Sequence, residues 1–234
     1  MTRAPVVRAS PNHGPRPPGT AIDLLILHYT GMQSAPAALA RLTDPAAEVS
    51  AHYLIDEDGT VYALVDEARR AWHAGVGSWV GANNINDRSI GIELVNPGHE
   101  FGYRPFPEAQ MRALETLARD IMARHGVPAH RAIGHSDIAP TRKQDPGELF
   151  DWARLARAGI GLWPRPAACA TLTGIALSAD EAAEARVLLA GLGYAMAEIP
   201  AAITAFQRHF RPARIDGVLD RDCLVRLRDL AAQR

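Results

Sequence analysis

The stretch from Gly134 to Gly147 gathers residue types that can do chemistry. His135 and Asp145 offer a ring nitrogen and a carboxylate oxygen to a metal ion, and Lys143 lies between them. The chain has 25 basic residues, and Lys143 is the only lysine among them. Lysine carries a compact ammonium group with a tunable pKa, a role that arginine does not fill. We therefore interpret this segment as functional rather than as scaffold.

A third possible metal ligand stands at the end of an apolar run. His28 follows the run 22–27, and His135 follows the short run 131–134, so both histidines are expected at strand ends. Zinc takes nitrogen and carboxylate ligands, and a catalytic zinc site keeps one position open for a water whose pKa falls to about 7. His28, His135 and Asp145 would complete such a set. Singly, each has an ordinary alternative as a polar strand end or a turn residue, and other histidines compete for the role: His52, His73, His99, His125 and His130.

Glu93 interrupts an otherwise apolar strand predicted over 89–95. A buried carboxylate is costly unless it is paired, bound to a metal or used. A desolvated glutamate with a raised pKa suits general acid–base catalysis beside an activated water, and Lys143 could stabilise an oxyanion. The alternatives are an edge strand with Glu93 facing solvent, and a solvated loop lysine.

The charge and hydropathy of the chain limit the classes of molecule that it is expected to bind. With 25 basic and 26 acidic residues the formal net charge is −1, which argues against nucleic acid or an anionic membrane as the main partner. No window approaches the ~20 apolar residues of a membrane span. Residues 1–20 lack an apolar signal region, so we expect a cytoplasmic protein, or a periplasmic or outer-membrane one if a leader was removed. We expect a monomer.

Strand and helix signals alternate along the first two thirds of the chain. They predict an α/β (α+β) fold, with a central mixed β-sheet flanked by helices. A small three-helix C-terminal domain follows, whose first helix should be capped by Ser178 and Glu181. We expect strands over 22–27, 51–55, 60–65, 89–95 and 131–134, and helices over 34–42, 107–125 and 148–158. The predicted organisation is an N-terminal arm (1–20), a metal-binding enzyme domain (21–161), a linker (162–177) and the helical domain (178–234).

Five segments, in order, resemble the type 2 N-acetylmuramoyl-L-alanine amidase family, with AmiD- and AmpD-like members, which shares its fold with peptidoglycan recognition proteins. The segments are 26–30, 50–55, 71–75, 86–93 and 134–147. The resemblance implies Zn²⁺ on His28, His135 and Asp145, Glu93 as the acid–base residue, and Lys143 as the stabiliser of the tetrahedral intermediate. It also implies a substrate-binding role for the residues His73, Trp72, His52 and Asn86.

The implied reaction is hydrolysis of the amide between N-acetylmuramic acid, or its 1,6-anhydro form, and L-alanine in peptidoglycan or muropeptides. Segments 188–194, 205–212 and 215–220 resemble the three-helix peptidoglycan-binding domain. Two alternatives remain open. One is a non-catalytic peptidoglycan recognition protein, and the other is a different zinc-dependent cell-wall peptidase.

Overall fold

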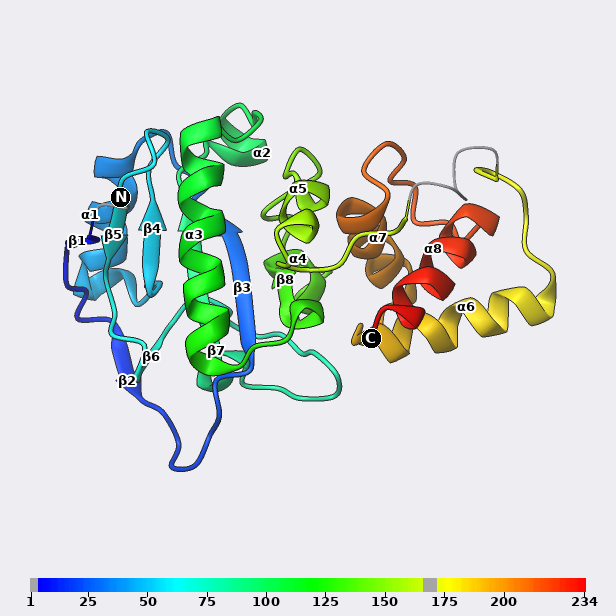
Figure 1. The fold of residues 1–234 in the computed structure, drawn as a ribbon, viewed down its shortest axis with the longest axis horizontal. Coiled ribbons are helices and arrows are strands. Elements are labelled where there is room, and N and C mark those ends of the chain that lie inside the picture. Colours follow the sequence, from blue (N-terminus) through cyan, green and yellow to red (C-terminus); the bar gives the residue numbers. More distant parts are fainter. Residues whose placement is uncertain (1–3, 166–171) are drawn as a thin grey trace.

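Short apolar strands build a six-stranded sheet with the order β1-β5-β4-β7-β3-β8 (Figure 1). The structure is a computed structural model, and it describes residues 4–165 and 172–234. Neighbouring strands are parallel except for the hairpin of β4 and β5, so the sheet is mixed, as predicted. The strands are β1 (Val6–Val7), β3 (Leu24–Tyr29), β4 (Tyr53–Ile55), β5 (Val61–Ala63), β7 (Ser89–Leu94) and β8 (Ala132–Gly134).

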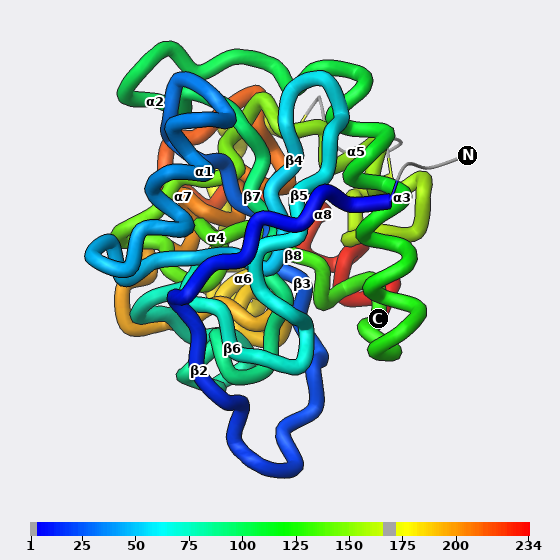
Figure 2. The backbone as a smooth tube through the Cα atoms, turned by 90° about the vertical axis from the view of Figure 1, so that its left-hand side faces the viewer, coloured from blue at the N-terminus to red at the C-terminus, as the bar shows by residue number. Residues whose placement is uncertain are grey.

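The N-terminal arm is part of the fold. β1 adds a parallel edge strand beside β5, and β2 (His13–Pro15) pairs with β6 (Arg69–Ala71) in a separate antiparallel ribbon. Figure 2 shows this dark blue segment running across the edge of the sheet. The guanidinium of Arg16 then donates to the backbone carbonyls of Asn86, Asp87 and Ser89. The arm therefore holds the start of β7 in place.

The two faces of the sheet are covered differently. Leu25 and Leu27 pack with Ile92 against the long helix α3 (Glu108–His125) on one face. Because side chains alternate along a strand, Leu24, Ile26 and His28 point to the other face. Figure 2 shows α3 on one side of the sheet and α1 (Ala35–Thr43) on the other. The polar end of β3 therefore opens on the face that α3 does not cover.

Local signals explain where the helices begin and end. The side chain of Ser34 accepts the backbone N–H of Ala37 at the start of α1, and Gly126 ends α3 with a φ of 66°. The remaining short elements are η1 (Pro45–Ala47), η2 (Ile85–Arg88), α2 (Gly98–Phe101), η3 (Ala129–Arg131), α4 (His135–Ile138) and α5 (Trp152–Arg157). The helix expected over 148–158 is thus shorter than predicted.

The C-terminal region contains the three predicted helices, α6 (Ala179–Leu192), α7 (Ile199–Phe210) and α8 (Arg221–Ala232). Ser178 and Glu181 form the predicted capping box. The apolar sides of these helices share one buried cluster with Leu24, Ile26 and Ile133 of the sheet. This region is therefore continuous with the core of the sheet. Of the predicted linker, residues 166–171 lie outside the described part of the chain.

Within residues 4–165 and 172–234, no helix has the length and apolar character needed to cross a membrane.

Candidate metal and catalytic site

Two adjacent parallel strands bring the predicted histidines together. Leu27 of β3 is the register partner of Gly134 of β8, so the next residues, His28 and His135, lie at the same end of these two strands. Asp145 reaches this end from the loop after α4. Its carbonyl accepts the backbone N–H of Ser136 at 2.9 Å, which ties the loop to the start of α4. Sheet register and one backbone hydrogen bond therefore position all three side chains.

Three ligand atoms converge at this end of the two strands. Nδ1 of His28 lies 2.9 Å from Nδ1 of His135. The Oδ2 atom of Asp145 lies 3.1 Å from the first and 3.0 Å from the second. All three residues are buried, with exposed fractions of 1%, 3% and 6%. The set that sequence reasoning proposed is thus one compact cluster.

The outer nitrogen of each histidine is engaged. Nε2 of His135 lies 2.9 Å from the carbonyl oxygen of Ala74, so it must carry the proton. Nε2 of His28 lies 3.0 Å from Nδ1 of His73. On its other side, Nε2 of His73 lies 3.1 Å from the hydroxyl of Ser89.

The hydroxyl of Ser89 sets the direction of this chain of hydrogen bonds. It donates to the carbonyl of Ile85 at 2.7 Å, so it accepts the N–H of His73 Nε2. Neutral His73 then accepts at Nδ1 from the Nε2–H of His28. Burial, with the nearby imidazoles, keeps the pKa of His73 well below its usual value. Nδ1 of His28 is therefore left with a bare lone pair that faces the cluster.

These hydrogen bonds make the cluster a cation site. The two Nδ1 atoms and the carboxylate oxygen are all acceptors, held close together with no proton to share among them. Burial, then the charge of His135, lowers the pKa of His28 to about 4. Burial opposes ionisation of Asp145, but both histidines outweigh it and hold its pKa far below the usual range. Neutral imidazoles and an ionised carboxylate are what zinc requires, so the donor set fits this metal.

Glu93 lies beside the cluster on the neighbouring strand. It is the register partner of His28, and β7 is a central strand, so the edge-strand alternative is excluded. Its Oε2 atom is buried and has no hydrogen-bond partner among the described residues. Burial, with the charge of Asp145, raises its pKa well above the usual value, and Lys143 opposes that shift. A half-buried carboxyl with an unsatisfied oxygen is suited to handling a proton.

Lys143 and its neighbour Arg142 have different surroundings. The guanidinium of Arg142 donates to the carbonyls of Ala74 and Val76, so it holds the loop. Lys143 lines the pocket, and its side chain has no hydrogen bond or ion pair within the described residues. Its ammonium is thus available to a ligand.

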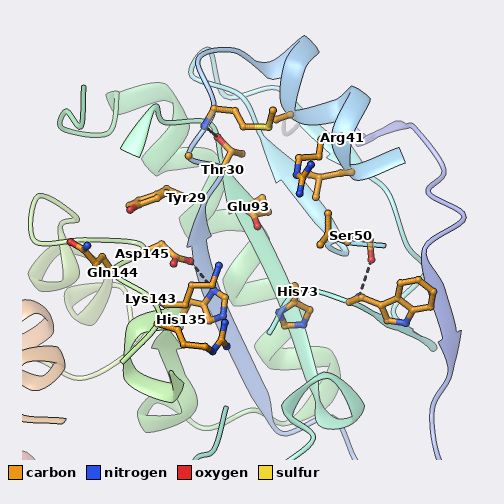
Figure 3. A pocket seen from close by; sticks show the side chains of 17 residues that line it. Tyr29, Thr30, Arg41, Ser50, His73, Glu93, His135, Lys143, Gln144 and Asp145 are labelled. Carbon is orange, nitrogen blue, oxygen red and sulfur yellow. Dashed lines mark hydrogen bonds and ion pairs between the residues drawn. The ribbon is translucent and has the colours of Figure 1, made fainter. Parts of the chain in front are cut away.

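The pocket above the cluster has a volume of about 380 Å³. In the view of Figure 3, Glu93 stands between His135, Lys143 and Asp145 on one side and Ser50 and Arg41 on the other. The pocket therefore brings together Glu93, the candidate metal ligands His135 and Asp145, and the side-chain cations of Lys143 and Arg41. Its lining consists of Tyr29, Thr30, Gly31, Met32, Ala38, Arg41, Leu42, Val49, Ser50, Trp72, His73, Glu93, His135, Arg142, Lys143, Gln144 and Asp145.

Trp72 and His73 line this pocket, but His52 and Asn86 do not. His52 is fully buried, and its Nδ1 accepts the backbone N–H of Gly91 at 3.0 Å. The Oδ1 atom of Asn86 accepts the backbone N–H groups of His73 and Ala74. His52 and the Oδ1 atom of Asn86 thus hold backbone groups beside the pocket, and the substrate-binding roles expected for these two residues stay predictions.

Sequence reasoning missed several pocket residues. Tyr29 follows His28 in the strand and Ser50 opens one of the motif segments, so position alone could have indicated both. Arg41 stands on α1 in no recognisable motif, and nothing in its local sequence marked it.

A family model described as N-acetylmuramoyl-L-alanine amidase matches residues 18–148. The chain is 40% identical over 219 residues to the N-acetylmuramoyl-L-alanine amidase AmiD of Escherichia coli, covering 85% of this chain and 78% of that protein. It is 34% identical over 163 residues to the 1,6-anhydro-N-acetylmuramyl-L-alanine amidase AmpD of Haemophilus influenzae, covering 62% of this chain and 86% of that protein.

A solved structure is similar over nearly the whole chain. It is the complex of AmiD from E. coli with anhydro-N-acetylmuramic acid-L-Ala-D-gamma-Glu-L-Lys. The TM-score is 0.80 at 37% identity, with 93% of this chain and 92% of that chain covered. The similarity therefore takes in the C-terminal helices as well as the sheet.

Proposed function

This chain belongs to the N-acetylmuramoyl-L-alanine amidase family and is an amidase, and we propose that it acts with zinc on His28, His135 and Asp145. The bond cleaved joins the lactyl group of N-acetylmuramic acid, or of its 1,6-anhydro form, to L-alanine. The observation that carries the metal proposal is the convergence of three buried acceptor atoms within 3.1 Å of one another.

Zinc in such a site lowers the pKa of a water and polarises a carbonyl oxygen. Glu93 is proposed to take the proton of the attacking water as the new C–O bond forms. It then delivers a proton to the alanine nitrogen as the C–N bond breaks. The products are a lactyl carboxylate and a peptide with a free amino terminus. The raised pKa of Glu93 supports this role, because a more basic carboxylate takes the proton of the water more readily and can then return it to the leaving nitrogen.

Lys143 is proposed to stabilise the negative charge that develops on the carbonyl oxygen. Its ammonium lacks a protein partner within the described residues and faces the same pocket as Glu93. A preorganised cation in a site that excludes water stabilises such charge strongly.

Arg41 supports a peptide substrate that carries carboxylates. Its guanidinium makes no hydrogen bond or ion pair within residues 4–165 and 172–234, and it lines the wall opposite Lys143 in Figure 3. An unpaired guanidinium binds carboxylates well. We therefore place the stem peptide along this wall, with the reacting amide over the metal cluster.

Product analysis tests this function. Zinc-loaded protein is incubated with anhydro-muropeptides and, separately, with sacculi, and the products are identified by mass spectrometry. We expect peptides that begin with a free L-alanine, lost on chelation and restored by zinc. Alanine left on the sugar would indicate a peptidase instead. No release from either substrate by the zinc-loaded protein would leave only the recognition-protein alternative.

We propose further that the C-terminal helices bind peptidoglycan. A groove of about 490 Å³ runs along α6, α7 and the loop before α8, and Val218 lines it with 58% of its surface exposed. Binding to sacculi is measured in a Glu93→Ala background, so that the ligand is not consumed. Val218→Glu should weaken binding, whereas Val187→Glu, at an exposed position of α6 outside the groove, should not. Equal binding by both variants would contradict this assignment.

A further inference from the structure

Asp137 is a buried carboxylate inside the ligand-bearing segment. It lies in α4, two residues after His135, and only 1% of its surface is exposed. Its Oδ2 atom accepts the backbone N–H of Gly134 at 2.8 Å. Gly134 is the last residue of β8 and directly precedes His135, so this bond closes the turn that carries the His135 imidazole.

The other partners of Asp137 come from the C-terminal helical region. The hydroxyl of Tyr194 donates to Oδ1 at 2.6 Å, and Nδ1 of His209 lies 2.8 Å from Oδ2. Both residues are buried, with exposed fractions of 3% and 2%. One carboxylate therefore joins a metal-ligand turn to two helical-region side chains more than fifty positions away.

Packing fixes both of these donors. The ring of His209 stacks between Trp152 and Phe210, with centroid distances of 3.8 Å on each side. Tyr194 follows Gly193, whose carbonyl accepts the backbone N–H of Val80 at 2.9 Å. Neither donor can follow Asp137 if that carboxylate moves.

The turn has little freedom to move without disturbing two ligands. A Cβ atom at Gly134 would lie 2.7 Å from Cδ of Pro146, the residue after Asp145. Ser136 also donates its backbone N–H to the carbonyl of Asp145. A shift of α4 therefore moves His135 and Asp145 together relative to His28.

Burial makes the helical-region contacts necessary. Without Tyr194 and His209, the Asp137 carboxylate would keep a single hydrogen bond while remaining out of water. A buried charge with lost partners drives local rearrangement, because each unsatisfied acceptor is costly. The rearrangement would fall on the turn that carries His135.

We propose that Tyr194 and His209 are positioning residues of the metal centre, acting through Asp137. The C-terminal helices then help to hold His135 in the geometry that binds zinc, and loss of their two donors weakens the site. This inference rests on the proposed zinc site, but its test is independent of amidase turnover.

The test uses the full-length chain and a paired substitution. Tyr194→Phe removes the hydroxyl, and His209→Phe removes the donor while keeping an aromatic ring in the stack. Tyr53→Phe is the matched control, because it also deletes a phenol-to-carboxylate bond, 2.7 Å to Glu67, outside the pocket lining. Zinc affinity is measured by competition with a chromogenic chelator, and kcat and KM are measured separately.

We expect the double variant to bind zinc about 10- to 100-fold more weakly, the range seen when residues behind metal ligands are changed. Its kcat should fall at subsaturating zinc with little change in KM, while Tyr53→Phe keeps the wild-type zinc affinity. Among single variants, His209→Asn should bind zinc more tightly than His209→Phe, because its amide retains a donor near the position of Nδ1.

Wild-type zinc affinity in the folded double variant would overturn the inference. Should that variant fail to fold, the Tyr194→Phe single variant carries the test, since it loses one oxygen atom. A wild-type chain that binds zinc but releases no peptide would refute the proposed reaction and leave the positioning role intact. A wild-type chain that binds no zinc would overturn both.

Discussion

Nε2 of His28 and Nδ1 of His73 lie 3.0 Å apart, and this bond selects which nitrogen of His28 faces the metal cluster. His73 lies against β7 at Gly91, where any side chain would place its Cβ within about 2.5 Å of the ring. Gly91 therefore leaves room for the ring of His73 to lie behind His28. His73 both lines the pocket and orients a ligand.

Replacing His73 should weaken metal binding. His73→Phe keeps a ring of similar shape but removes the acceptor of the His28 N–H, so the tautomer of His28 is no longer selected. We expect zinc affinity to fall about 10- to 100-fold, measured by chelator competition. Trp72→Phe is a suitable control, because Trp72 lines the same pocket without contacting a ligand. Equal zinc affinity in His73→Phe and wild type would contradict the orienting role.

Glu93→Gln should separate metal binding from catalysis. The amide keeps the size of the side chain but cannot accept and deliver the reaction proton, so kcat should fall by about 10²- to 10⁴-fold. Zinc content, measured by elemental analysis, should stay at the wild-type level because Glu93 is not among the three clustered ligands. Glu93→Ala should behave in the same way. Unchanged turnover in either metal-loaded variant would remove Glu93 from the mechanism.

Lys143→Arg tests whether a compact ammonium is needed. The planar guanidinium is larger and distributes its charge differently, so we expect kcat to drop by about 10-fold or more, with Lys143→Met lower still. Arg142→Lys is the matched control for the loop, because Arg142 holds the carbonyls of Ala74 and Val76. Arg142→Lys should lower the melting temperature and have a smaller effect on kcat than Lys143→Arg. Full activity in Lys143→Arg would mean that the single lysine of the chain has no special role.

Arg41→Gln should affect substrate binding more than chemistry. Arg41 lines the pocket wall on α1, away from the three ligands, and lacks a protein partner within the described residues. Loss of a carboxylate contact made equally in the ground and transition states raises KM and leaves kcat unchanged. Steady-state kinetics with a carboxylate-bearing muropeptide and with its amidated form provide the measurement. An equal rise in KM for both substrates would argue against a carboxylate contact.

Glu67 gives the fold an acid-sensitive component. Burial tends to raise its pKa, but hydrogen bonds from Arg124, Tyr53 and His125 outweigh burial and lower it to about 2. The folded state therefore binds this proton less readily than the unfolded chain, whose glutamate pKa is near 4.5. The resulting stabilisation is complete above about pH 5 and is lost as the pH falls towards 2.

Glu67→Gln removes this titration while keeping the shape of the side chain. We expect the variant to melt below wild type at neutral pH, and the gap between the two melting temperatures to narrow as the pH falls from 5 to 3. Thermal unfolding at a series of pH values measures this gap. A difference that stays constant with pH would show that Glu67 stabilises the fold by packing alone.

Much of the architecture follows from local signals. The Ser34 cap, the start of α3 after Pro107 and the capping box of Ser178 and Glu181 are each decided within a few residues, so the sequence predicted these helices well. The arm strands were missed because β1 and β2 contain two and three residues, too few for a periodic pattern. Their pairing depends on partners near β5 and β6, far along the chain.

By itself, the amino-acid sequence determined the residue types, the alternating strands and the strand ends that carry His28 and His135, because these depend on neighbours in the chain. Only the tertiary structure decided which donor and acceptor atoms lie within hydrogen-bond distance of one another. It assigned His52 and Asn86 to backbone groups, set His73 behind His28, and joined Asp137 to Tyr194 and His209. The physical reason is that side-chain hydrogen bonds depend on packing between segments remote in sequence, for which local periodicity carries no information.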